Sequence, residues 1–146
     1  MTDLPSRITD YIGASPEKLA DLSATGFDSI IGFRFTDLTP DGAKAEFEVR
    51  PDLHQPYGIV HGGVYCAVIE SMTSMSAAAW LGDDGYVVGV NNNTDFLRSV
   101  SEGRLYASTA PLHRGRSQQL WEARVTDEHG RVIAHGQVRL HNMTRL

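Results

Sequence analysis

The chain has 146 residues, and its 13 Lys and Arg residues against 18 Asp and Glu residues give a net charge of −5. This length suits a single domain, and we expect an N-terminal segment over 1–27 followed by a core over 28–142. The acidic balance argues against a general nucleic-acid-binding protein. One cysteine excludes an internal disulfide and is typical of a reducing compartment. Because neither a signal peptide nor a membrane span is visible, we expect a cytoplasmic protein.

The N-terminal segment predicts one short helix. Ser15 suits the N-cap, Pro16 fits the first helical position, and Gly26 is typical of a helix stop. Two strands are expected next, over 29–35 and 43–50, on either side of a Thr-Pro-Asp-Gly turn. The second strand alternates apolar and charged residues, so one of its faces should meet a core and the other water.

The only long helix is expected over 64–81, and its surface is nearly uncharged. Between Asp52 and Asp83 the single formally charged side chain is Glu70. A helix without a charged face should be covered on most sides. Buried carboxylates are rare unless paired, because an isolated charge loses its hydration. Two interpretations stay open for Glu70: a core residue bonded to the backbone or a serine, or a catalytic group.

The rest of the chain predicts four further strands, over 86–97, 105–113, 118–126 and 132–141. A single antiparallel sheet that curls around the helix satisfies this order, since every strand can turn an apolar face to the helix. Such a sheet leaves strand edges open, which favours pairing between subunits. Gly89, inside a predicted strand, would allow a neighbouring backbone to approach closely.

The N-terminal end of the predicted helix has features that suit the binding of a developing negative charge. Gly62 and Gly63 lack a Cβ, so that a ligand carbonyl can approach the backbone. The first amides of a helix have no intrahelical partner and are partly positive, as an oxyanion requires. Glycines that merely allow close packing remain the alternative. Glu70 and Ser74, four residues apart, share one face of this helix.

Gln55, Gly62, Gly63, Glu70 and Ser74, at this spacing, resemble the hotdog acyl-CoA thioesterases. The segment looks most like the 4-hydroxybenzoyl-CoA thioesterase subgroup that carries a Glu on the central helix, close kin of the phenylacetate-pathway thioesterases. The similarity covers roughly 29–142. It implies an α+β hotdog fold, in which an antiparallel sheet wraps around one long helix. It also implies hydrolysis of an acyl-CoA to a carboxylic acid and free CoA, with aryl or arylacetyl esters favoured and medium-chain acyl groups as the second choice.

The resemblance also implies roles for individual residues. Glu70 would attack the thioester carbonyl directly or activate a water, and the sequence leaves both routes open. Ser74, where the closest subgroup has a threonine, would position the water or the carboxylate. Gln55 would contact the thioester, and the Gly62 amide would bind its oxygen. His61 could serve in acid–base chemistry, but we favour a structural role in orienting the loop by hydrogen bonds.

The residues expected to bind the CoA part of the substrate are Gly63, Arg98, Arg114, Arg116 and Ser117. Arginine suits the pyrophosphate and 3′-phosphate of CoA through its forked donors. Solvated surface arginines remain the alternative for each of them. The six histidines are scattered without metal-ligand spacing, so we expect no metal. We expect no cofactor beyond the CoA of the substrate.

The expected partners are the acyl-CoA substrate and further copies of the chain, without nucleic acid or membrane. The resemblance implies a dimer, with dimers pairing into a tetramer, in which Gln55 and Gly62 of one subunit face Glu70 of its neighbour. Two other functions remain open for the fold. One is a non-catalytic acyl-CoA binding module. The other is an enoyl-CoA hydratase or acyl-carrier dehydratase, which usually pairs an acid with a catalytic histidine; no such pair is apparent around Glu70.

Overall fold

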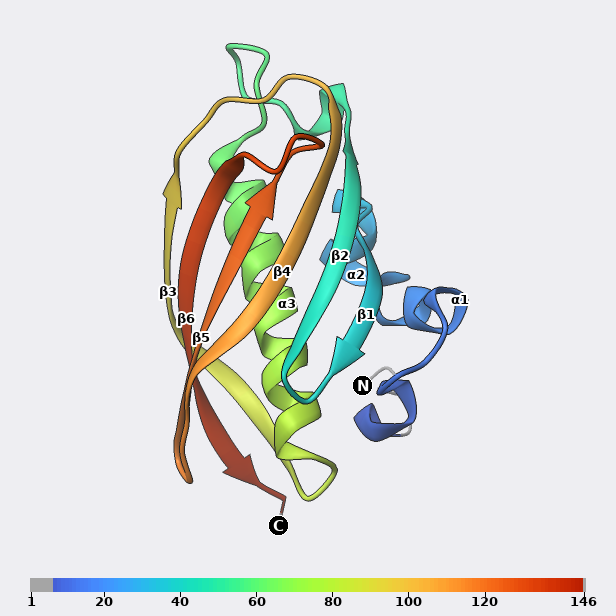
Figure 1. Ribbon diagram of the computed structural model, residues 1–146, viewed down its shortest axis with the longest axis vertical. Coiled ribbons are helices and arrows are strands. Elements are labelled where there is room, and N and C mark those ends of the chain that lie inside the picture. The colour runs from blue at the N-terminus through green and yellow to red at the C-terminus, as the bar shows by residue number, and fades with distance from the viewer. Residues whose placement is uncertain (1–6, 146) are drawn as a thin grey trace.

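The computed structural model describes residues 7–145, and it places one long helix inside a curved antiparallel sheet (Figure 1). The helix, α3, spans Gly62–Leu81. The sheet has six strands in the order β1-β2-β4-β5-β6-β3. The strands are β1 (Arg34–Thr39), β2 (Gly42–Val49), β3 (Gly85–Phe96), β4 (Gly103–Arg114), β5 (Gln118–Thr126) and β6 (Val132–Thr144). This is the α+β hotdog architecture, as expected.

The N-terminal segment contains more helix than the sequence predicted. Ser15 caps α1 (Pro16–Leu19) by accepting a hydrogen bond from the Lys18 amide, as expected. Gly26 does not end a helix but begins α2 (Gly26–Ile31). The strand predicted over 29–35 is wrong in its first half for the same reason. The left-handed residue that stops the helix is Gly32, with a φ of 83°, and only then can β1 begin. The short 3-10 helices are η1 (Ile8–Tyr11), η2 (Ala20–Ser23) and η3 (Pro51–Leu53).

The core lies between the inner face of the sheet and α3. The predicted alternation of β2 is confirmed, since Ala45 and Phe47 are buried while Lys44 and Glu48 are exposed. The opposite wall is formed by helix side chains such as Met72, which is fully buried. One stripe of the helix, however, is only half-buried in the single chain: Cys66, Ala67, Glu70, Ser71, Ser74 and Met75. The expectation that the helix is covered on most sides is therefore met only in part.

The two edges of the sheet differ. The β1 edge lies beside the N-terminal helices (Figure 1). The β3 edge is longer, and its exposed side chains include Tyr86, Val88 and Val90. The β6 strand continues to Thr144 because it pairs with β3 as far as Gly85. Within residues 7–145, no helix combines the length and the hydropathy that a bilayer crossing needs.

Candidate active site

The Glu70 side chain is half-buried and turned toward β3. Its Oε2 accepts a hydrogen bond from the Asn92 side-chain amide at 3.1 Å. The same amide nitrogen donates to the Cys66 carbonyl at 3.1 Å, one helical turn earlier. The Asn92 oxygen in turn accepts from the Thr94 hydroxyl at 2.7 Å. Glu70 is thus held by a polar network that links the helix to the edge strand.

Gly89 leaves the space that the other carboxylate oxygen occupies. A Cβ built on Gly89 would lie 2.1 Å from Glu70 Oε1, which is closer than any non-bonded contact allows. The sequence predicted that Gly89 would let a neighbouring backbone approach. The structure shows a different use within the chain, because the missing side chain makes room for the carboxylate of Glu70.

His61 is the N-cap of α3. Its Nδ1 accepts a hydrogen bond from the Gly63 amide at 2.8 Å, so the proton of a neutral imidazole lies on Nε2. This geometry supports the structural interpretation of His61. It also gives the Gly63 amide an internal partner. The Gly62 amide stands at the first helical position, where no intrahelical acceptor exists.

Gly62 also makes room for an aromatic ring. A Cβ at this position would lie 2.5 Å from the Phe96 ring. Phe96 in turn lies beside Tyr65, with ring centroids 6.1 Å apart. The Tyr65 hydroxyl is buried, and no described residue gives it a hydrogen-bond partner. Burial raises the pKa of this hydroxyl to about 12.

A cavity of about 300 Å³ opens at this end of α3. It brings together three residues that the sequence singled out, Gln55, Gly62 and Arg98, with the rings of Tyr65 and Phe96. The Gln55 side-chain oxygen accepts from the Tyr57 amide, whereas its Nε2 has no acceptor among the described residues. Arg98 is exposed and uses one nitrogen to bond the Val132 carbonyl at 2.9 Å.

Glu70 does not belong to this cluster within one chain. Gly62 and Glu70 are eight residues apart on α3, which is about 12 Å along the helix axis. A thioester oxygen bound at the Gly62 amide would therefore lie too far from the Glu70 carboxylate of the same chain for direct chemistry. Ser74 lies one turn beyond Glu70, half-buried and further still from the cavity.

The predicted CoA-binding residues at the end of β4 and just beyond it lie at the opposite end of α3. The Arg114 guanidinium bonds Asp41 Oδ1 at 2.7 Å and the Pro40 carbonyl at 3.0 Å. It also lies 5.7 Å from the Trp80 ring centroid and 5.8 Å from that of Trp121. These contacts give Arg114 a structural role.

The next two predicted CoA-binding residues remain accessible. The side chains of Arg116 and Ser117 are exposed, while their carbonyls accept hydrogen bonds from Asn142. Within one chain, these two residues and Arg114 lie apart from both Arg98 and Gly62.

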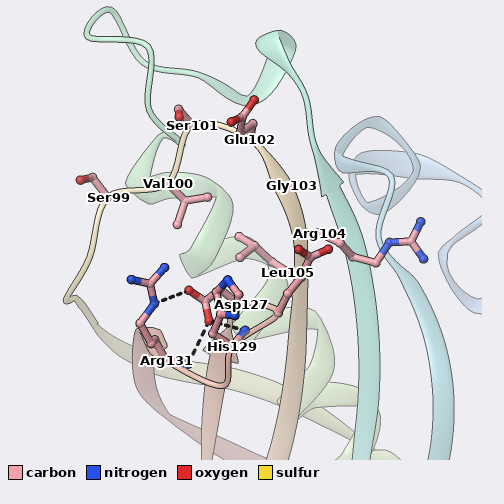
Figure 2. A pocket seen from close by; sticks show the side chains of 11 residues that line it. Ser99, Val100, Ser101, Glu102, Gly103, Arg104, Leu105, Asp127, His129 and Arg131 are labelled. Carbon is pink, nitrogen blue, oxygen red and sulfur yellow. Dashed lines mark hydrogen bonds and ion pairs between the residues drawn. The ribbon is translucent and has the colours of Figure 1, made fainter.

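A second cavity, of about 510 Å³, lies between the β3–β4 loop and the β5–β6 turn (Figure 2). Most of the residues that line it are polar, but its two arginines already have hydrogen-bond partners. Arg131 bonds Asp127, and Arg104 extends across β2 to Glu46 and Glu48. No predicted catalytic residue lines it.

The lyase alternative usually pairs an acid with a catalytic histidine. No histidine contacts Glu70 in the part of the chain that the structure describes; its partner is the uncharged Asn92. Residues 7–145 also contain no group of three His, Cys, Asp or Glu side chains able to hold a metal ion.

Sequence reasoning missed Asn92, Thr94 and Tyr65. The only signal was three consecutive asparagines in a predicted strand, where asparagine is disfavoured.

Comparison with known proteins identifies the family of the chain. Residues 57–134 match the family model described as the thioesterase superfamily. The Mycobacterium tuberculosis protein Rv1847, by name an esterase, is 59% identical over 133 residues, which cover 88% of this chain and 95% of that protein. Its solved structure has a TM-score of 0.80 and covers 82% of this chain and 98% of its own.

Two further solved structures are similar. AziG of S. sahachiroi is 48% identical, with a TM-score of 0.81, and covers 83% of this chain and 98% of its own. The Haemophilus influenzae thioesterase HI1161 is 27% identical, with a TM-score of 0.84, and covers 90% of this chain and 92% of its own. By the family match and by these identities, the chain belongs to the thioesterase superfamily.

Proposed function

We propose that the protein hydrolyses the thioester bond of an acyl-CoA and that Glu70 is the catalytic carboxylate. The observation that carries this proposal is the placement of Glu70, a lone carboxylate on the central helix that is held at one oxygen by Asn92. Membership in the thioesterase superfamily supports the reaction class. So does the thioesterase name of the Haemophilus relative.

The reaction adds water across the bond between the acyl carbon and sulfur. The carbonyl carbon gains the oxygen of water, the carbon–sulfur bond breaks, and the thiolate of CoA takes up a proton. Glu70 has two routes to this result. It either takes the proton of the attacking water, or attacks the carbonyl itself to form an anhydride that water then opens. In both routes the carbonyl oxygen becomes negative, and the Gly62 amide with the Gln55 Nε2 would stabilise it.

Because Gly62 and Glu70 of one chain are about 12 Å apart along the helix, we propose a site built from two subunits. Gln55 and Gly62 of one subunit would face Glu70 of its neighbour. The edge strand β3 supports such an assembly, since it has no charged residue from Gly85 through Thr94. Natural edge strands usually carry charges or prolines that prevent pairing with another chain. A dimer would cover this edge and the half-buried stripe of α3, and two dimers would form the tetramer.

The rings of Tyr65 and Phe96 support an aromatic acyl group, because aromatic side chains pack favourably against a planar ring. We therefore propose aryl- or arylacetyl-CoA, as in the 4-hydroxybenzoyl-CoA and phenylacetate-pathway thioesterases, with medium-chain acyl-CoA as the second choice. Arg98, Arg116 and Ser117 are the exposed candidates for the phosphates of CoA.

A hydrolysis panel tests the proposal. Purified protein is assayed with aryl-, arylacetyl- and straight-chain CoA esters, and release of free thiol is followed. The nearly isosteric variant Glu70→Gln is expected to lower kcat by about three orders of magnitude while the unfolding midpoint stays close to that of the wild type. If Glu70→Gln keeps more than about a tenth of the turnover, the carboxylate is structural. Tight binding of the esters without turnover would instead identify an acyl-CoA binding module.

Mixing two inactive variants tests the shared site. Gln55→Ala and Glu70→Ala each lack one half of it, so mixed dimers would contain one intact copy. We expect part of the activity to return after the subunits have exchanged. If exchange is confirmed and no activity returns, the site does not combine Gln55 and Glu70 from different chains.

A further inference from the structure

The side-chain amide of Asn92 joins three groups in a defined orientation. Its Nδ2 lies 3.1 Å from both Glu70 Oε2 and the Cys66 carbonyl oxygen, and its Oδ1 lies 2.7 Å from Thr94 Oγ1. A carbonyl oxygen and an ionised carboxylate can only accept hydrogen bonds, whereas the hydroxyl can donate. The nitrogen must therefore face the helix and the oxygen must face Thr94. The chemistry of the partners sets the orientation of the amide.

The backbone around Asn92 leaves room for this network. Thr94 pairs across the sheet with Gly136 of β6. A Cβ on Gly136 would lie 2.5 Å from Thr94 Oγ1, so this position needs glycine if the hydroxyl is to point inward. On the helix side, one amide nitrogen bonds both the Cys66 backbone and the Glu70 side chain. The carboxylate is thereby tied to the axis of its own helix.

We propose that Asn92, oriented by Thr94, is the positioning residue for Glu70, an inference that rests on the proposed thioesterase function. A glutamate side chain has several rotatable bonds, and misplacing a reacting group by about 1 Å can cost about 100-fold in rate. Asn92 holds Oε2, and Oε1 lies over Gly89, where no side chain blocks it. An asparagine at a half-buried strand position, where an apolar residue would pack better, is explained by this bond.

The first test removes the amide and keeps the volume. Asn92→Leu is expected to lower kcat by about tenfold to a hundredfold and to change KM by less than about threefold, since Asn92 acts on the carboxylate. The matched control is Asn93→Leu, which makes the same change at the next residue of β3, where the side chain lies on the opposite face of the sheet from Asn92 and Glu70. We expect the control to keep kcat within about twofold of the wild type.

The second test separates positioning from packing. Thr94→Val keeps the shape of the side chain and removes the hydroxyl that orients Asn92, so kcat should fall by about threefold to tenfold. Thr94→Ser restores the hydroxyl on a smaller side chain and should restore kcat to within about twofold. If the valine variant is fully active, or the serine variant is as impaired as the valine variant, Thr94 does not orient the amide and the proposal fails.

The third measurement does not depend on turnover. The urea unfolding midpoints of Asn92→Leu, Glu70→Met and the double variant form a cycle, and a bond between the two side chains predicts non-additive effects. Additive effects would overturn the proposal. It would also be overturned if Asn92→Leu kept the kcat of the wild type while Glu70→Gln was inactive. The latter outcome leaves the thioesterase function standing. A wild type that hydrolyses no thioester overturns the proposed function, while the unfolding cycle still decides whether Asn92 holds Glu70.

Discussion

The two ends of α3 differ in how their polar groups are satisfied. At the C-terminal end, Gln119 donates to the Ala77 and Asn142 oxygens and accepts from Trp121 Nε1 at 2.8 Å. At the N-terminal end, the buried Tyr65 hydroxyl has no partner among residues 7–145. A buried polar group left without a partner costs free energy, and a ligand can recover it. The comparison indicates that the C-terminal end stabilises the fold and that the N-terminal end is available for binding.

The largest expected effect is on stability and comes from the C-terminal end. Trp121 is fully buried, so Trp121→Ala should lower the free energy of unfolding by about 3–5 kcal/mol. The change also removes the donor to Gln119 and one of the rings beside Arg114. Urea unfolding measures the loss. If kcat per folded site falls by more than about tenfold, the C-terminal end of α3 does not serve stability alone.

Gly89→Ala should have the next largest effect, this time on catalysis. The new methyl group would stand 2.1 Å from Glu70 Oε1, so the carboxylate must move. We expect kcat to fall by about a hundredfold with little change in the unfolding midpoint. Asn91→Ala, an exposed neighbour on the same strand, serves as the control and should remain active. Wild-type turnover in Gly89→Ala would show that the observed position of Oε1 is not the catalytic one.

Charge reversal should have different effects at Arg114, the last residue of β4, and at Arg116, just beyond it. Arg116→Glu should raise KM for CoA esters by about tenfold, and the effect should shrink as salt rises. Arg114→Glu should chiefly lower stability, because Arg114 is bound to Asp41 and packed against Trp80 and Trp121. A short thioester without the nucleotide provides the control. If Arg116→Glu raises KM equally for that substrate, the residue does not bind the phosphates.

The smallest effect is expected at Tyr65, as a change in the pH dependence of stability. Burial raises the pKa of the Tyr65 hydroxyl to about 12, above its value in the unfolded chain. The unfolded chain therefore loses this proton first, and stability should fall as the pH rises from about 10 toward 12. Tyr65→Phe should remove this part of the alkaline decline and leave neutral stability unchanged or slightly higher. Unfolding midpoints at pH 8 and 11 measure the difference, and equal declines in both proteins would contradict the assignment.

Local sequence signals determined much of the architecture. The long helix, the alternation of β2 and the span of β5 could all be predicted, because they depend on short-range hydrophobic periodicity. The spacing of Gly62 and Glu70 was also visible in the sequence. The boundary between α2 and β1 was not, because two glycines compete to end the same segment. Only the packed chain decides that Gly32 does so and that Gly26 begins a helix.

The partners of the site residues were decided by the tertiary structure alone. Asn92 meets Glu70 because β3 runs beside α3, a contact between segments more than 20 residues apart that no local pattern encodes. Packing likewise brought Arg98 to Gly62 and tied Arg114 to Asp41 at the other end of the helix. The sequence by itself determined which side chains can do chemistry, since that depends on residue type and spacing. Which of them are free to do so depends on long-range contacts, and these exist only once the sheet has closed around the helix.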